Sequence, residues 1–285
     1  MSAQMTEVKG GDLTSLLAPL EQLVGEAAAL LASMQAGPRA VSRKELRDVV
    51  TDADLAAERL LLDGLRKLTP DADILSEEAG ASDGAHTESD HFWGQGKLRW
   101  VIDPLDGTIN YAGGLPLFSA TVAGQIDGET VLGVVHAPRF PLIGRFLRGA
   151  SSEASVAEVN GLPARVSQTK ELADAIVSVS LTSNYGPEEV RRTSEIIQRL
   201  ANRARGVRVV VSGALEMSLV AAGQFDAFVA LGADLVSHAA SMALVRAAGG
   251  KATDLSGKEA ADEDRERVVS NGLIHDEILS IISNV

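Results

Sequence analysis

Residues 100–111 read W-V-I-D-P-L-D-G-T-I-N-Y, and the rest of the chain is organised around this stretch. The apolar run 100–102 has the composition and length of a short buried strand. Asp103-Pro104 is predicted to stop the strand, because proline lacks a backbone donor and has a fixed φ. Asp103 and Asp106 then follow a strand end, where a tight turn can aim both carboxylates and the carbonyl between them at one point. Hard oxygen ligands that converge in this way suit Mg²⁺.

The next two residues extend the predicted site. Gly107-Thr108 offers backbone N–H groups and a hydroxyl, which can hold a phosphate if a helix begins there. The string D-P-L-D-G also has a simpler interpretation, a turn between two core elements, because aspartate and glycine are common in turns. The wider sequence is needed to choose between the two.

The full string resembles the signature of the inositol monophosphatase family, Mg²⁺-dependent phosphatases of small sugar and nucleotide phosphates. Nearly every position fits. The resemblance implies an α+β, layered αβαβα sugar-phosphatase fold, with an antiparallel sheet and helices in the first half and alternating helices and strands in the second. It also implies that the chain is a phosphoric monoester hydrolase.

Length and composition bound the organisation of the chain. Its 285 residues suffice for one large domain or two closely packed halves. We expect a flexible N-terminus over 1–12 and one compact unit over 13–285. Within that unit, 13–150 forms a metal-binding α+β half and 151–285 an α/β half.

Charge and residue usage narrow the range of partners. The formal charge of −13 argues against a nucleic-acid backbone as partner. The absence of cysteine leaves carboxylate and imidazole as the side-chain ligands for a metal. No apolar window approaches about 18 residues and no signal-peptide pattern opens the chain, so we expect no membrane partner and a cytoplasmic location.

Two helices are predicted ahead of the central stretch. Apolar residues at helical spacing predict the first over 13–35, and Thr51 is the expected N-cap of a second that runs to about Leu68. Asp54 then lies in the first turn, where a carboxylate complements the helix dipole without any further role. The pattern D-x-V-T-x-x-D is also similar to the family's second motif, and this resemblance implies that Asp54 and Thr108 orient the attacking water.

A short strand over 73–78 ends in two glutamates. Adjacent glutamates usually form a solvated loop. These two resemble the family's G-E-E element, which implies that Glu77 is a metal ligand, although Ser76 replaces the glycine. Residues 79–97 are expected to form a mobile loop near the site. Its histidines, His86 and His91, receive no role.

The remaining chain supplies strands and then alternating elements. Residues 118–126, 131–136 and 143–147 are predicted to form an antiparallel segment of sheet. Strands at 175–180, 207–211 and 226–231 alternate with helices at 188–203, 214–222 and 237–248, which predicts helices layered on a sheet. The resemblance to the family extends to N-G-L-P at 160–163 and N-G-L-I-H at 271–275, so it covers essentially the whole chain from Leu13.

The family pattern breaks at two positions. An aspartate supplies the last metal carboxylate in the family, and Ser237 stands at that place. Ser237 is expected to act as an N-cap, but a hydroxyl is a far weaker Mg²⁺ ligand. Asp234 is a substitute ligand only if the loop before the helix rearranges. Ala230 stands where inositol-specific members carry a glutamate, which argues against inositol phosphate as the preferred substrate.

The resemblance also assigns the mechanism, direct attack of water on a phosphate monoester. Glu77, Asp103 and the Leu105 carbonyl would hold the Mg²⁺ that activates the water. Asp103 and Asp106 would hold a second ion on the leaving-group oxygen, and the backbone groups of Gly107 and Thr108 would bind the phosphate. Because the missing acid belongs to the second ion, we expect weak binding there and a high Mg²⁺ requirement.

Three functions from different classes remain open on sequence grounds. The first is a phosphatase of a small phosphorylated metabolite, such as a sugar, nucleotide or specialised-metabolite phosphate. The second is a catalytically impaired member that binds a phosphorylated ligand or partner. The third is a repurposed enzyme, such as a lyase or cyclase, on the same fold. Retention of the water-orienting residues favours the first, and Ser237 favours the others. A homodimer is expected by analogy with the family alone.

Overall fold

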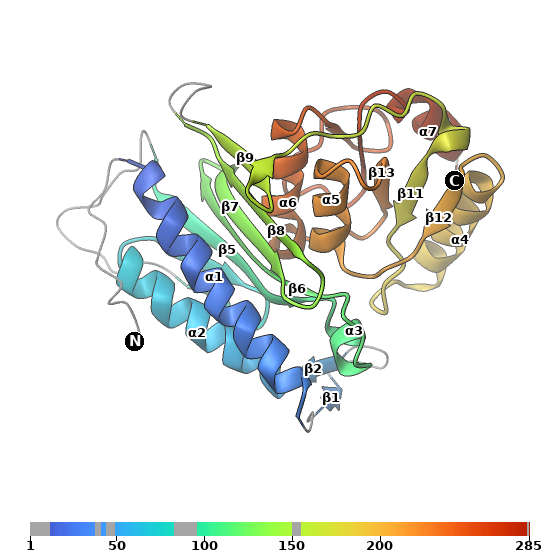
Figure 1. Ribbon diagram of the computed structural model, residues 1–285. Helices are drawn as coiled ribbons and strands as arrows, with labels where there is room; N and C mark the ends of the chain where they lie inside the picture. Colours follow the sequence, from blue (N-terminus) through green and yellow to red (C-terminus); the bar gives the residue numbers. More distant parts are fainter. Residues whose placement is uncertain (1–11, 38–40, 44–48, 83–95, 150–154, 284) are drawn as a thin grey trace.

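A computed structural model describes residues 12–37, 41–43, 49–82, 96–149, 155–283 and 285. His86, His91 and the first eleven residues of the expected N-terminal segment lie outside the described residues. The chain packs as alternating layers of helices and sheets (Figure 1).

The first layers come from the N-terminal part of the chain. Helices α1 and α2 cover one face of an eight-stranded sheet of order β10-β9-β8-β7-β6-β5-β3-β4. All neighbours in it are antiparallel except β3 and β5, which run parallel. The elements are α1 (Thr14–Gln35), β1 (Val41–Arg43), β2 (Val49–Thr51), α2 (Asp52–Leu68), β3 (Asp73–Ser76), β4 (Gly80–Ser82), β5 (Leu98–Asp106), α3 (Thr108–Ala112), β6 (Ser119–Ile126), β7 (Glu129–Ala137), β8 (Leu142–Leu147), β9 (Val156–Val159) and β10 (Leu162–Pro163).

The remaining layers come from the C-terminal part. Helices α5 and α6 lie between the large sheet and a five-stranded sheet of order β12-β11-β13-β15-β14, and α4 and α7 cover the outer face of the smaller sheet (Figure 1). The layers therefore run αβαβα, which confirms the predicted fold class. The elements are η1 (Leu172–Asp174), β11 (Ile176–Val179), α4 (Pro187–Ala201), β12 (Gly206–Arg208), α5 (Gly213–Ala221), β13 (Ala227–Ala230), α6 (Leu235–Ala247), β14 (Lys251–Thr253), β15 (Arg267–Ser270) and α7 (His275–Ile282).

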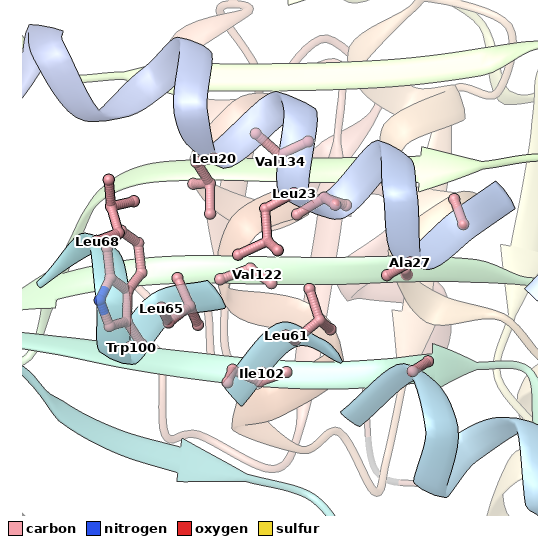
Figure 2. Packing of buried hydrophobic residues seen from close by; sticks show 14 of the residues in the cluster. Leu20, Leu23, Ala27, Leu61, Leu65, Leu68, Trp100, Ile102, Val122 and Val134 are labelled. Atoms are coloured by element: carbon pink, nitrogen blue, oxygen red, sulfur yellow. The ribbon is translucent and has the colours of Figure 1, made fainter. Parts of the chain in front are cut away.

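The core under α1 and α2 holds the central strand in place. Figure 2 shows Leu20 and Leu23 of α1 and Leu61 and Leu65 of α2 packed over the strands of the large sheet, in the same cluster as Trp100 of β5. All five side chains are almost fully buried. Burial of each such side chain contributes about 1.5–3 kcal/mol. The end of β5, which carries the two aspartates, is thereby attached to a rigid scaffold.

Helix α1 is both long and apolar. In the described part of the chain it is the one helix long and apolar enough to cross a membrane by length and composition. Its inner face, which includes Leu16, Leu20 and Leu31, is fully buried against the rest of the protein. A place in the protein core therefore explains the apolar composition of α1.

Several predicted boundaries differ from the observed ones. Strand β5 does not stop at Asp103 but continues to Asp106, with an irregular register against β6 between the two aspartates. Strand β12 ends at Arg208, so the predicted strand over 207–211 is wrong beyond its second residue. Residues 80–82, predicted to lie in a loop, form β4 beside β3.

Candidate active site

The two aspartates of the central stretch are buried at the end of β5. Asp103 is 1% exposed and Asp106 is 7% exposed. The Leu105 N–H donates to Asp103 Oδ1 at 3.0 Å, which closes the turn between them. Gly107 follows with φ at 90°, and a Cβ on it would lie 2.8 Å from the Leu117 carbonyl oxygen. Only glycine fits there without strain.

Asp103 is held by a residue far away in the sequence. Ser237 Oγ donates to Asp103 Oδ2 at 2.7 Å. Burial raises the pKa of Asp103 well above its usual value, and the charges of Glu77, Asp106 and Asp234 raise it further, while the hydrogen bond from Ser237 lowers it. The site therefore carries an excess of negative charge that a cation would relieve.

Asp106 accepts hydrogen bonds from the start of α5. Ser212 Oγ donates to it at 2.6 Å, Ala214 N at 3.0 Å and Gly213 N at 3.1 Å. Ser119 Oγ of β6 adds a fourth bond at 3.2 Å. Burial raises the pKa of Asp106 to about 6, in opposition to the hydrogen bonds from Ser212, Ala214 and Ser119.

Asp54 and Thr108 lie in contact, as the family resemblance implied. Thr108 Oγ1 is 3.2 Å from Asp54 Oδ1 and 3.0 Å from the Leu105 carbonyl oxygen. The predicted N-cap Thr51 is confirmed, and Asp54 Oδ2 accepts from its backbone N–H at 2.8 Å in a capping box. Burial raises the pKa of Asp54 against the hydrogen bonds from Thr51 and Thr108.

Most predicted site residues line one small cavity of about 110 Å³. Asp54 does not line the cavity itself but contacts Thr108, which does. Within the described ranges, no three acidic or histidine side chains group closely enough for a metal site made of side chains alone. A complete ligand set therefore needs the Leu105 carbonyl or a further donor. The predicted residues on the wall are Glu77, Asp103, Leu105, Asp106, Gly107, Thr108, Asp234 and Ser237.

Asp234, and not Ser237, caps α6. Asp234 is the N-cap of α6, and its Oδ1 accepts from the Ser237 N–H at 2.7 Å. The predicted N-cap Ser237 is therefore wrong, because α6 begins at Leu235 and Ser237 lies inside its first turn. That position leaves the serine hydroxyl free of capping and directs it to Asp103.

Four residues that line the cavity were not anticipated from the sequence. Ser180, Thr182, Ser183 and Asn184 line the cavity directly after β11. Loops that follow parallel strands carry ligand-binding residues in open α/β sheets, so the end of the predicted strand over 175–180 was the available signal.

His238 on α6 was also missed, and it is 5% exposed. Its ring occupies the space that a side chain on Gly213 would need, since a Cβ there would lie 2.1 Å from Nε2. No local pattern indicates this pairing. The second predicted departure, Ala230, is buried in β13 and is not part of the cavity wall.

The layered arrangement and the acidic cavity at the start of α5 and α6 define a protein of the sugar-phosphatase fold class. The chain belongs to the inositol monophosphatase family, whose model matches residues 12–285. The resemblance inferred from the central stretch is thus confirmed over nearly the whole length.

Individual relatives are similar over most of their length. The fructose-1,6-bisphosphatase/inositol-1-monophosphatase of Thermotoga maritima is 38% identical over 239 residues, 84% of each chain. The Nus factor SuhB of Escherichia coli K12 is 34% identical over 233 residues, 80% of each chain. A solved IMPase structure from Thermotoga maritima matches with a TM-score of 0.77 at 35% identity and covers 92% of this chain and 94% of that one. Extragenic suppressor protein suhB of Bartonella henselae matches with a TM-score of 0.83 at 25% identity, covering 95% and 99%.

Proposed function

We propose that the chain is a Mg²⁺-dependent phosphatase that hydrolyses a small phosphate monoester by direct attack of water. The observation that carries this proposal is the contact of Thr108 Oγ1 with both Asp54 Oδ1 and the Leu105 carbonyl oxygen, at 3.2 and 3.0 Å. It joins a buried carboxylate to a hydroxyl on the wall of the acidic cavity. A protein that only binds phosphate has no need of such a pair.

The donor atoms fit one Mg²⁺ ion. Glu77, Asp103 and the Leu105 carbonyl would hold it, and all of them offer the oxygen ligands that Mg²⁺ prefers. Burial raises the pKa of Asp103, and the neighbouring acids Glu77, Asp106 and Asp234 raise it further, which supports the fit because those acids leave negative charge for a cation to neutralise. When bound, the ion would polarise the phosphate and lower the pKa of a water molecule.

The donor atoms do not complete a second site of the family's kind. Asp103 and Asp106 would contribute, but the third position is occupied by the Ser237 hydroxyl. Asp106 Oδ2 already accepts three hydrogen bonds, and Asp234 Oδ1 caps α6. We therefore infer weak binding of a second ion and a high Mg²⁺ requirement, with Asp234 as a minor alternative ligand.

The protein's own residues would prepare the water and hold the phosphate. Thr108 can donate to Asp54 and accept from the attacking water, so that a proton can pass toward the carboxylate. Burial raises the pKa of Asp54, which brings it nearer to the basicity that a proton acceptor needs. The backbone of Gly107 and Thr108, at the start of α3, would bind the phosphate.

The substrate is proposed to be a small sugar, nucleotide or specialised-metabolite phosphate. The hydroxyl and amide groups of Ser180, Thr182 and Asn184 can hydrogen-bond a polar leaving group. Inositol phosphate is disfavoured because Ala230 offers no group to its ring hydroxyls. The relative named fructose-1,6-bisphosphatase/inositol-1-monophosphatase makes sugar phosphates the first compounds to test.

Ser237 favours a second candidate, an impaired member that binds a phosphorylated ligand or a repurposed enzyme such as a lyase or cyclase. The relative named Nus factor SuhB makes a role other than hydrolysis worth testing.

A homodimer and a cytoplasmic location also remain proposals. The exposed side chains of Ile109, Leu115 and Val209 are the candidate dimer contacts, and light scattering on Leu115→Asp would test them.

The deciding experiment is phosphate release from sugar, nucleotide and inositol monophosphates across a Mg²⁺ titration. Asp103→Asn should abolish release. Asp262→Asn is the matched control, because Asp262 is a buried, hydrogen-bonded carboxylate that does not line the active-site cavity. Release by the wild-type protein and by Asp262→Asn alone supports the phosphatase. If the wild-type protein releases no phosphate from any compound at high Mg²⁺, the phosphatase proposal is overturned in favour of the second candidate.

A further inference from the structure

A buried glutamate behind the active site organises the turn that carries Glu77. Glu58 lies on α2 and is 6% exposed. Its Oε1 atom accepts from Ser76 Oγ at 2.5 Å, from Ala79 N at 2.9 Å and from Glu78 N at 3.2 Å. One carboxylate oxygen thus ties the end of β3 to the two residues that follow Glu77.

The same turn is fixed from its other side. Glu77 N donates to the carbonyl oxygen of Ile102 at 3.2 Å, which extends the parallel pairing of β3 and β5 by one bond. Ile102 directly precedes Asp103. The backbone of Glu77 is therefore held between Glu58 and the strand that supplies the buried aspartate.

Electrostatics explain why such a restraint is needed. Glu77 and Asp103 line the same small cavity, so the two carboxylates repel each other when no cation lies between them. Glu77 is exposed and its side chain could move outward into water. A turn with a fixed backbone limits that movement and keeps the carboxylate on the cavity wall.

We propose that Glu58 is a positioning residue, which holds the turn 76–79 so that Glu77 stays beside Asp103 as a metal ligand. The inference rests on the proposed Mg²⁺ site. Glu58 follows Asp54 by one helical turn on α2, so one rigid helix sets both the residue that contacts Thr108 and the turn that carries Glu77. Ser76 is part of this arrangement, because its hydroxyl makes the shortest of the three bonds.

The test is a calorimetric titration of the metal-free protein with Mg²⁺, which needs no turnover. Glu58→Ala should weaken the affinity by about 10–100-fold, the usual cost of losing a group that orients a metal ligand. Glu58→Gln should stay within about threefold of the wild type, because the amide oxygen keeps an acceptor in the place of Oε1. Ser76→Ala should fall between them. Asp262→Ala, which removes another buried carboxylate with several donors, should lower the melting temperature without changing Mg²⁺ affinity.

Several other outcomes would overturn the inference. Wild-type affinity in folded Glu58→Ala would overturn it, and so would equal weakening in Glu58→Gln and Glu58→Ala, since charge rather than positioning would then be responsible. If Glu58→Ala does not fold, wild-type affinity in Ser76→Ala overturns it instead. Absence of Mg²⁺ binding by the wild-type protein would overturn both this inference and the metal dependence. Normal binding without phosphate release would overturn only the proposed hydrolysis.

Discussion

Ser237 Oγ donates a hydrogen bond of 2.7 Å to Asp103 Oδ2, and this contact joins the first turn of α6 to the end of β5. Members of the family resembled by the central stretch have an aspartate at this place. The hydroxyl satisfies one lone pair of the buried carboxylate but adds no negative charge. The cavity therefore has one carboxylate fewer than the family pattern at this place.

Replacing Ser237 with aspartate should restore the missing ligand. We expect Ser237→Asp to lower the Mg²⁺ concentration for half-maximal activity by at least about tenfold, because a carboxylate is a much stronger ligand than a hydroxyl. Without Mg²⁺ the variant should melt at a lower temperature than the wild type, since a further negative charge joins Asp103 and Asp106. Ser237→Ala, which adds no charge, is the control. An unchanged Mg²⁺ curve for Ser237→Asp would contradict the ligand role.

Asp54 should be needed for turnover rather than for helix stability. We expect Asp54→Asn to lower kcat by about 10²–10⁴-fold, because it removes the proton acceptor behind Thr108. Asp52 provides a matched control in the same first turn, exposed and equally near the helix dipole. Kinetics and melting temperatures of both variants separate the two roles. Equal losses of kcat in Asp52→Asn and Asp54→Asn would favour a dipole effect.

Glu216 should make stability depend on pH. Its side chain is fully buried, and burial raises its pKa from the usual 4.5 to about 7 in opposition to the hydrogen bond from Ser178. The folded state therefore binds more protons than the unfolded state between these values, so this group's contribution to the free energy of unfolding falls by about 3 kcal/mol as pH rises through that window.

The measurement is urea unfolding of the wild type and Glu216→Gln at about pH 5 and about pH 8. The variant should become more stable relative to the wild type as pH rises, because glutamine does not ionise. Glu129→Gln removes an exposed acid and serves as the control. A constant difference between Glu216→Gln and the wild type at the two pH values would refute the prediction.

Gly213 should be intolerant of any side chain. A Cβ there would lie 2.1 Å from His238 Nε2, so Gly213→Ala should destabilise the protein by about 1–3 kcal/mol. The double variant with His238→Ala removes the clash and should recover much of that loss. Gly25→Ala, within helix α1, is the control. A Cβ at this position would lie 3.7 Å from His136 Nδ1, an ordinary van der Waals distance. Additive losses in the double variant would show that the two residues do not compete for space.

The local signals of this chain predicted its architecture well. Apolar spacing marked α1 and α2, and the alternation of elements after residue 175 indicated helices layered on a sheet. These patterns succeed because period and capping are properties of neighbouring residues. The N-cap Thr51 is one example, since its partners Ala53 and Asp54 lie within three positions.

Local signals failed where tertiary contacts control the backbone. Val211 has φ at 62°, which a β-branched residue rarely adopts, so the predicted strand over 207–211 cannot continue through it. Glu216 accepts from the N–H groups of Val210 and Ser212 on either side, and Asn110 Nδ2 donates to the Val210 carbonyl oxygen. Three hydrogen bonds with side chains of α5 and α3 therefore shape this segment against its strand propensity.

The chemical inventory of the site could be read from the amino-acid sequence. The two aspartates around Pro104, the glutamates after β3 and the absence of an acid at Ser237 are properties of residue identity, and they define the oxygen ligands available to a cation. Which atoms meet was decided by the fold. Ser237 lies 134 positions from Asp103 and contacts it because α6 packs across β5. Glu58 reaches the turn of Glu77 because α2 packs on the same strand. Such contacts depend on how helices dock on a sheet, and short-range spacing carries no information about docking.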